Sequence, residues 1–142
     1  MNAADVIALL ELRPHPEGGW FTETWRAAAP PGERSAGTAI YYLLDQGDRA
    51  HWHRLDVDEV WHHYAGGGLV LEVARVDGST RRLVLGPRLH EGERPQAVVP
   101  AGAWQSAEPV DGWVLVGCTM APGFAGEDLA PPCWSPDGAD PA

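Results

Sequence analysis

The sequence predicts an all-β domain of many short strands, arranged as a sandwich or barrel, with one short helix at its start. The 17 Gly and 13 Pro among 142 residues supply frequent turns, and apolar residues recur with the period of strands from Gly19 onward. The length and the 44% hydrophobic content suit a single folded domain. We expect this domain over residues 1–130, followed by a loose tail rich in Pro, Asp and Gly over residues 131–142.

The expected elements follow in order along the chain. A helix over residues 2–12 begins at an N-cap provided by Asn2 or Asp5 and ends before Pro14. The Asp77-Gly78 pair is typical of a hairpin turn between two strands. The expected strands are residues 20–25, 38–44, 50–54, 59–64, 69–76, 80–85, 96–99 and 113–120.

The charge of the chain limits its partners. Twenty acidic residues against ten basic ones give a formal net charge of -10, so we expect neither nucleic acid nor an anionic membrane as a partner. The first twelve residues lack a signal-peptide pattern, and no apolar run reaches the length of a membrane span. We therefore expect a cytoplasmic protein whose partner is a small-molecule ligand.

The candidate functional residues concentrate in AHWHRLDVDEVWHHY, residues 50–64. On an extended strand His51 and His53 project to the same face, about 7 Å apart along the backbone. Glu59 opens the next strand, where alternation places Glu59, Trp61 and His63 on one face. The pattern therefore predicts a pocket in which two imidazoles and a carboxylate meet.

This segment resembles the first motif of the cupin superfamily, in which His-x-His and a Glu lie between two glycines. The matching positions are Gly47, His51, His53, Glu59 and Gly66. The second motif, Pro-x-Gly followed by a His, is matched by Pro100 and Gly102, with Gln105 in place of the His. The resemblance implies a cupin-type jelly-roll β-barrel with a short N-terminal helix.

The same resemblance suggests a metal site. In metal-binding cupins the matching positions, here His51, His53, Glu59 and Gln105, hold one divalent transition metal ion, for example Fe, Ni, Mn or Zn. A neutral amide at position 105 binds such an ion less well than an imidazole would. A pocket that works without metal therefore stays open as an alternative.

Four blocks extend the resemblance over most of the chain: residues 14–26, 51–66, 95–108 and 116–124. They are similar to a subgroup of short cupins with no assigned function. That subgroup is similar in fold to sugar-nucleotide epimerases, which are dimeric cupins that work without a metal. The resemblance implies a homodimer and places His51 where those enzymes have a catalytic base.

Two functions remain open. The first is an enzyme that transfers a proton on a small polar or sugar-like metabolite in an isomerisation, epimerisation or dehydration. His51 would be the base, Glu59 or an inward-facing Tyr42 the acid, and His53 and Gln105 would hold a carbonyl oxygen. The second is a module that binds or stores a small ligand without converting it.

Other residues have a candidate role beside a structural one. His63 either lines the pocket or is structural. Glu23 either contacts the ligand or forms a surface ion pair with Arg26. Trp61 and Trp104 either stack on a ring or sugar face or pack in the core.

Overall fold

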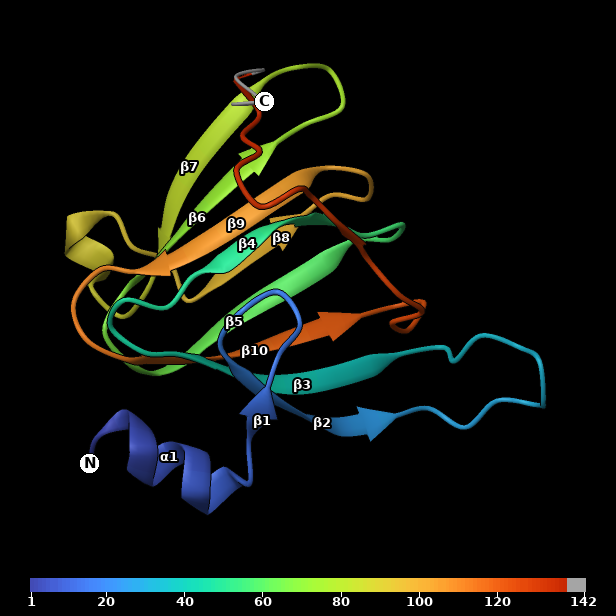
Figure 1. Cartoon of the computed structure of the whole chain (residues 1–142), viewed down its shortest axis with the longest axis horizontal. Coiled ribbons are helices and arrows are strands. Elements are labelled where there is room, and N and C mark those ends of the chain that lie inside the picture. Colours follow the sequence, from blue (N-terminus) through green and yellow to red (C-terminus); the bar gives the residue numbers. More distant parts are fainter. Residues whose placement is uncertain (138–142) are drawn as a thin grey trace.

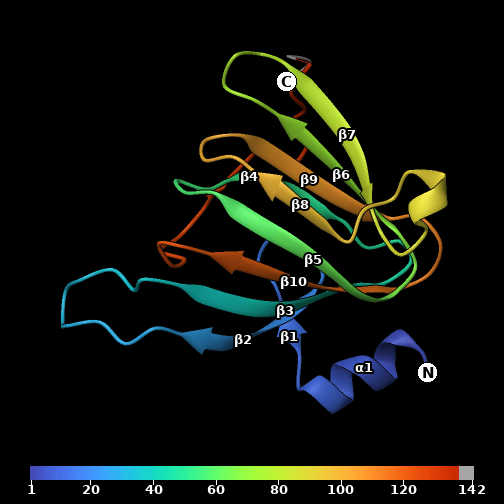
Figure 2. The same ribbon diagram turned by 180° about the vertical axis from the view of Figure 1, so that it is seen from behind.

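Two antiparallel sheets face each other and enclose the core, with a short helix beside the first of them (Figure 1). This computed structural model describes residues 1–137. The view from behind shows the helix next to strands β1 to β3, apart from the second sheet (Figure 2). No helix among residues 1–137 combines the length and the apolar character needed to cross a membrane.

Helix α1 (Ala3–Leu10) forms where the sequence predicts it, with Asn2 as its N-cap. The Asn2 side chain accepts a hydrogen bond from the backbone of Asp5 at 2.9 Å, and the Asp5 carboxylate accepts one from the backbone of Asn2 at 2.8 Å. The helix ends at Glu11, which adopts the left-handed conformation. Its apolar face packs against Leu43 and so covers the outside of the first sheet.

Each sheet has its own set of strands. The six-stranded sheet has the order β1 (Arg13–Pro14), β2 (Trp20–Arg26), β3 (Thr38–Leu44), β10 (Val114–Met120), β5 (Glu59–Gly66) and β8 (Gln96–Val99). The five-stranded sheet has the order β11 (Asp128–Leu129), β4 (Ala50–Arg54), β9 (Trp104–Pro109), β6 (Leu69–Ala74) and β7 (Thr80–Leu85). A short 3₁₀-helix, η1 (Leu89–Glu91), precedes β8.

The space between the sheets is filled unevenly. Toward the end of β3 and the start of β10, aliphatic side chains such as Leu44 and Val114 pack with almost no exposure. At the opposite end of these strands Met120 pairs with Thr38 on one side and with Glu59 on the other. Polar side chains gather at this second end, and the functional site lies there.

A β-bulge interrupts β4 where it pairs with β9. Ala50 pairs with Ala107 and His53 pairs with Gln105, so two residues lie between Ala50 and His53 on β4 where one lies between their partners on β9. Ala50 belongs to the hydrophobic core, and His53 also points between the sheets. The extra residue in the bulge therefore breaks the simple alternation of faces along β4.

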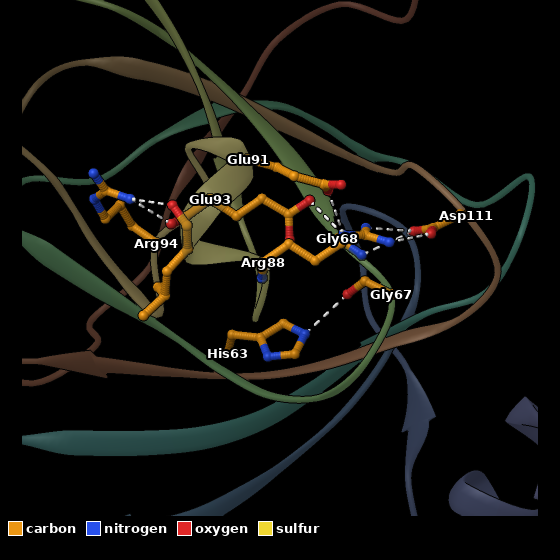
Figure 3. Close-up of polar contacts among 9 residues, drawn as sticks. His63, Gly67, Gly68, Arg88, Glu91, Glu93, Arg94 and Asp111 are labelled. Atoms are coloured by element: carbon orange, nitrogen blue, oxygen red, sulfur yellow. Dashed lines mark hydrogen bonds and ion pairs between the residues drawn. The ribbon is translucent and has the colours of Figure 1, made fainter.

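The end of the fold opposite the site is held by a polar network (Figure 3). Arg88 donates to Glu93 and to Asp111, both at 2.8 Å, and Asp111 accepts the backbone N–H of Gly68 at 3.0 Å. The hydrogen bonds from Arg88 lower the pKa of Asp111 to about 2. This network joins the segments before β6, β8 and β10.

His63 lies in the same region (Figure 3). Its Nε2 is 2.9 Å from the carbonyl oxygen of Gly67, to which it donates. The expectation that His63 lines the pocket is wrong, because His63 lies toward the C-terminal end of β5 whereas the cavity lies at Glu59, the first residue of β5.

Candidate functional site

A cavity of about 300 Å³ opens between the sheets at the end marked by Met120. Strand β2 contributes Phe21, Glu23 and Arg26, while β4 and β5 contribute His53 and Glu59. Part of the wall is apolar and is formed by Phe21, Ile40, Leu55, Met120 and Phe124. A cavity of this size and mixed lining is typical of a site for a small molecule.

The loop between β1 and β2 brings two functional groups into the cavity. It turns sharply, since the His15 N–H donates to the Gly19 carbonyl at 2.9 Å, and the His51 N–H ties the loop to β4 through the Glu17 carbonyl at 2.8 Å. Gly18 has a φ of 112°, and a Cβ there would overlap the carbonyl oxygen of Arg49. The glycine therefore lets the loop approach β4 closely enough to bury Glu17.

Glu17 and His53 form a buried pair. The Glu17 Oε2 and His53 Nε2 atoms lie 3.1 Å apart, and both side chains are at least 94% buried. His53 Nδ1 is 2.8 Å from the carbonyl oxygen of His51, which can only accept, so Nδ1 carries a proton. Nε2, the ring nitrogen that faces Glu17, then carries no proton when the imidazole is neutral.

Burial sets the charge state of this pair. Burial, and then the neighbouring carboxyl groups of Glu127 and Glu59, raise the pKa of Glu17 well above its usual range. Burial lowers the pKa of His53. Both shifts favour neutral forms, so this contact joins a protonated carboxyl group and a neutral imidazole rather than two charges.

Glu59 is a second buried carboxyl group in the cavity. Gln105 Nε2 donates to Glu59 Oε1 at 3.1 Å, while Trp61 Nε1 donates to Gln105 Oε1 at 3.0 Å. The Trp61 contact fixes which way the Gln105 amide points. Burial raises the pKa of Glu59 to about 7, so the group is divided between its acid and carboxylate forms at neutral pH.

His15 stands beside the buried pair as a neutral group. The Glu17 N–H donates to His15 Nδ1 at 3.1 Å, so the remaining proton of the imidazole lies on Nε2. Burial lowers the pKa of His15 to about 4. The imidazole ring packs edge-on against Phe21, with ring centres 4.5 Å apart.

His51 does not face the cavity. Its Nε2 lies 3.1 Å from the carbonyl oxygen of Ala130 and 2.9 Å from that of Pro131, in the segment that follows β11. The expectation that His51 and His53 share one face is wrong, because the β-bulge turns His51 away from His53. His51 therefore holds the C-terminal segment against β4.

The other candidate residues are divided between the cavity and its surroundings. Glu23 lines the cavity and also forms the ion pair with Arg26, at 2.8 Å. Trp61 is only 1% exposed and belongs to the hydrophobic core. Trp104 lies on the outer face of β9, because Gln105 faces inward, and packs against Trp134 with ring centres 4.7 Å apart. Neither Trp borders the cavity.

Tyr42 faces inward from β3 and is fully buried. Its hydroxyl donates to the carbonyl oxygen of Gly18, and its ring centre lies 5.2 Å from that of His15. Burial raises the pKa of Tyr42 well above its usual range. Tyr42 therefore supports the loop that carries Glu17 from behind the cavity wall.

The four expected metal ligands do not meet around one point. His53 and Glu59 line the cavity, but His51 points elsewhere and both polar atoms of the Gln105 amide have protein partners. This set does not fit a metal ion.

A different group does bring possible ligand atoms together. One such atom from each of His15, Glu17 and Glu127 lies within 4.8 Å of the others. An imidazole and two carboxyl groups are ligand types that divalent metal ions accept.

Reasoning from the sequence missed the part played by His15 and Glu17. The first of the four matching blocks contains both residues, in the order His-x-Glu-Gly-Gly. Two polar residues directly before a Gly-Gly pair were the available indication of a tight loop that carries functional groups. Glu127 had no comparable indication, since it enters the cavity from a segment distant in sequence.

Comparison with known families agrees with this architecture. The family described as Cupin superfamily (DUF985) matches residues 4–130. The chain belongs to the cupin superfamily. No protein of curated function matches this cupin significantly in sequence.

Two solved structures resemble this cupin over most of its length. Protein SO0799 from Shewanella oneidensis shares 38% identity with a TM-score of 0.86, covering 92% of this chain and 85% of that one. A hypothetical protein from Leishmania major shares 34% identity with a TM-score of 0.82, covering 88% and 84% of the two chains. Most of the fold of this cupin therefore recurs in both.

More distant cupins show the fold alone. An oxalate decarboxylase shares 15% identity with a TM-score of 0.63, covering 84% of this cupin and 30% of that chain. The coconut allergen cocosin shares 18% identity with a TM-score of 0.62, covering 81% and 29%. A decarboxylase and an allergen thus share a similar fold with this cupin, and only the site can indicate what this cupin does.

Proposed function

We propose that this cupin is an enzyme that transfers a proton on a small polar metabolite carrying a carbonyl group, in an isomerisation or epimerisation. The observation that carries the proposal is the placement of two buried carboxyl groups, Glu17 and Glu59, in one cavity of about 300 Å³. Their environments differ, because Glu17 faces an imidazole whereas Glu59 faces an amide. Two titratable groups in different environments can act as acid and base in one reaction.

The roles follow from the two pKa shifts. With a pKa of about 7, Glu59 is substantially ionised at neutral pH and can remove a proton from the carbon beside the carbonyl. Glu17, whose pKa lies well above its usual range, keeps its proton and can donate it to the carbonyl oxygen. The product of this step is an enol, with Glu59 protonated and Glu17 ionised. Glu59 then returns a proton to the neighbouring carbon, or water protonates the other face of the same carbon while Glu59 releases its proton to solvent. A hydroxyl of the enol gives its proton back to Glu17 and completes the reaction.

His53 and Gln105 assist these two groups. His53 Nε2 lies 3.1 Å from Glu17 Oε2 and helps to hold the Glu17 carboxyl group in place. Gln105 holds Glu59 in place, which reduces the cost of organising the base for the reaction. In this proposal the base is Glu59, and His51, which points away from the cavity, has no part in the chemistry.

A metal-assisted version of the same site is the second candidate, favoured by the grouping of His15, Glu17 and Glu127. These residues would hold one divalent ion, which would polarise the carbonyl oxygen in place of the Glu17 proton. Elemental analysis of protein purified without chelator separates the two versions. About one transition-metal ion per chain, lost in Glu127→Gln, supports the metal version, and a metal-free protein with full activity contradicts it.

Solvent exchange tests the proposed reaction directly. In deuterated water we expect the protein to introduce deuterium beside the carbonyl of at least one member of a panel of keto-sugars and their phosphates, followed by NMR. Glu59→Gln and Glu17→Gln should each slow this exchange by about a hundredfold or more. Glu72→Gln, at an exposed position of β6, is the matched control and should leave it unchanged.

The result that contradicts an enzyme is binding without exchange. A panel member that binds in the cavity, yet gains no deuterium above the rate without protein, points to a module that holds a ligand unchanged. The shape of the cavity suits ligand binding as well as catalysis, so the rate of deuterium exchange decides between the two functions.

A further inference from the structure

The arginine side chains that line the cavity differ in what they bind. Arg26 directs Nε and Nη2 to the two oxygens of Glu23, both at 2.8 Å, and Nη1 to the carbonyl oxygen of Phe124 at 3.1 Å. The guanidinium of Arg13, by contrast, makes no hydrogen bond or ion pair with any residue of the described chain, 1–137. Arg13 therefore offers unused donors to whatever occupies the cavity.

The guanidinium of Arg13 lies over an aromatic ring although its donors are unused. Arg13 pairs with Phe21 across β1 and β2, and its Cζ lies 5.5 Å from the centre of the Phe21 ring. This cation–π contact holds the charge over an aromatic ring that itself lines the cavity. The planar guanidinium presents its donors in a fixed fork, so it loses less conformational entropy per hydrogen bond formed with a ligand.

The charged and titratable side chains of the cavity differ in exposure between its mouth and its inner end. Arg13 is exposed, whereas Glu17, His53 and Glu59 are each more than 90% buried. An anion cannot approach the inner end without meeting the carboxyl groups there, but it can reach Arg13 at the mouth. The phenyl ring of Phe21 lies between these regions, in contact with both Arg13 and His15.

We propose that Arg13 binds an oxyanion of the ligand, a carboxylate or a phosphate, while the carbonyl group of the same molecule lies between Glu17 and Glu59. The substrate class is then a small acidic carbonyl compound, such as a keto acid or a sugar phosphate. The assignment of the carbonyl end rests on the proposed function, but the binding of an oxyanion at Arg13 does not. The planar guanidinium can bind either oxyanion through two parallel hydrogen bonds.

Matched pairs of probes test this proposal by calorimetry. Fructose 6-phosphate is compared with fructose, and 2-oxobutyrate with 2-butanone, so that each pair differs in the charged group. We expect the anionic member of at least one pair to bind at least tenfold more tightly, with an affinity that falls as salt is added. Preference within the first pair identifies phosphate as the bound group, and preference within the second identifies carboxylate.

Two variants make the result specific to Arg13. Arg13→Gln should weaken binding of the anionic probe about tenfold to a hundredfold and leave its neutral counterpart unaffected. Arg75→Gln, an exposed arginine outside the cavity, should bind both as the native protein does. An unchanged thermal unfolding temperature shows that Arg13→Gln still folds.

Several outcomes overturn the proposal: equal binding of charged and neutral probes, no binding of any probe, or the same loss in Arg13→Gln and Arg75→Gln. Deuterium exchange on the same samples separates this proposal from the proposed function. Binding that depends on Arg13 without exchange removes the reaction and keeps the oxyanion site. Equal exchange into fructose and its phosphate, unaffected by Arg13→Gln, removes the oxyanion site and keeps the reaction.

Discussion

At the scale of single residues, the site depends on carboxyl groups kept away from water. Burial disfavours the charged form of a carboxyl group, so an ionised Glu59 makes the folded state less stable than a protonated one. The pKa of Glu59 rises from 4.5 to about 7, and each unit of such a shift corresponds to about 1.4 kcal/mol. The free energy of unfolding therefore decreases as the pH rises from 4.5 to about 7.

Replacement of Glu59 by glutamine should remove this decrease. The folded-state pKa is raised, so the contribution of Glu59 to stability is full below pH 4.5 and is lost as the pH rises toward 7. Urea unfolding measures the free energy of unfolding of Glu59→Gln minus that of the native protein. This difference should be more favourable to the variant at pH 8 than at pH 4, by up to about 3 kcal/mol. The effect of His15, whose pKa is lowered, runs in the opposite direction but is present in both proteins.

Exposed carboxyl groups provide the control for this measurement. Glu72→Gln, on the outer face of β6, should show no difference between the two pH values. If Glu59→Gln has the same effect on stability at pH 4 and at pH 8, Glu59 is not a buried carboxyl group with a raised pKa.

Individual residues also show where inference from the sequence succeeds. The motif and the alternation of strand faces place Glu59 and Gln105 inward, and the structure joins them by a hydrogen bond of 3.1 Å. The same alternation fails for His51, because a β-bulge requires no particular residue type and so leaves no pattern in the sequence. The number of residues between two side chains predicts their faces only where a strand pairs without interruption.

At the scale of elements, the loop between β1 and β2 is the part on which the site most depends. Gly18→Ala should destabilise the protein by about 3 kcal/mol or more, because the new methyl group overlaps the Arg49 carbonyl and φ is unfavourable for alanine. Gly47→Ala is the matched control, since Gly47 also has a positive φ, 90°, but no atom lies within 4 Å of the added methyl group.

Urea unfolding compares the two glycine variants. Gly47→Ala should lower the free energy of unfolding by about 1 kcal/mol, because the positive φ is unfavourable for alanine but the added methyl group overlaps no atom. Similar losses in both variants would mean that the loop does not pack closely against β4, and the account of how Glu17 becomes buried would then be wrong.

The segment after β11 is a second element that shapes the site. Trp134 packs edge-on against Trp52 with ring centres 5.9 Å apart, and the Ala130 N–H donates to the Trp52 carbonyl at 2.9 Å. Trp134→Ala should cost on the order of 2 kcal/mol and should increase hydrogen exchange at Ala130. Leu129→Ala, at a side chain that is 48% exposed, should leave both nearly unchanged. Exchange at Ala130 that is equally slow in both variants would contradict an anchoring role for Trp134.

Elements differ in how well the sequence predicts them. Strand β3, which is rich in β-branched and aromatic residues, has the bounds expected from its composition. Strand β9, with the sequence WQSAEP, was missed because small and polar residues dominate it. It becomes a strand because β4 and β6 pair with it on either side, which is a tertiary effect.

At the scale of the whole molecule, the outer face of the six-stranded sheet carries large apolar side chains. Trp25, Tyr64 and Val98 are each more than half exposed there. Light scattering should give twice the chain mass of 15.3 kDa, because a second copy would cover these side chains. Val98→Glu should yield the monomer, and a native protein that has the monomer mass at micromolar concentration would contradict the dimer.

The barrel as a whole was predictable because the chain carries both motifs that resemble those of cupins, and this resemblance implies the arrangement of the strands. The position of the cavity was also predictable, since His53 and Glu59 both belong to the first motif and both line it. The composition of the cavity was not, because Glu17 and Glu127 arrive from a loop and from a segment near the C-terminus. When residues are close in space but far apart in sequence, their spacing along the chain does not predict that they meet.

Carbon NMR of protein labelled in its glutamate carboxyl groups tests the central claim most directly. We predict that the resonance missing in Glu59→Gln titrates near pH 7, and that the resonance missing in Glu17→Gln titrates well above the usual range of a glutamate. Titration of both resonances with midpoints near 4.5 would contradict the account, because neither group would then be the buried acid or base that the proposed reaction needs.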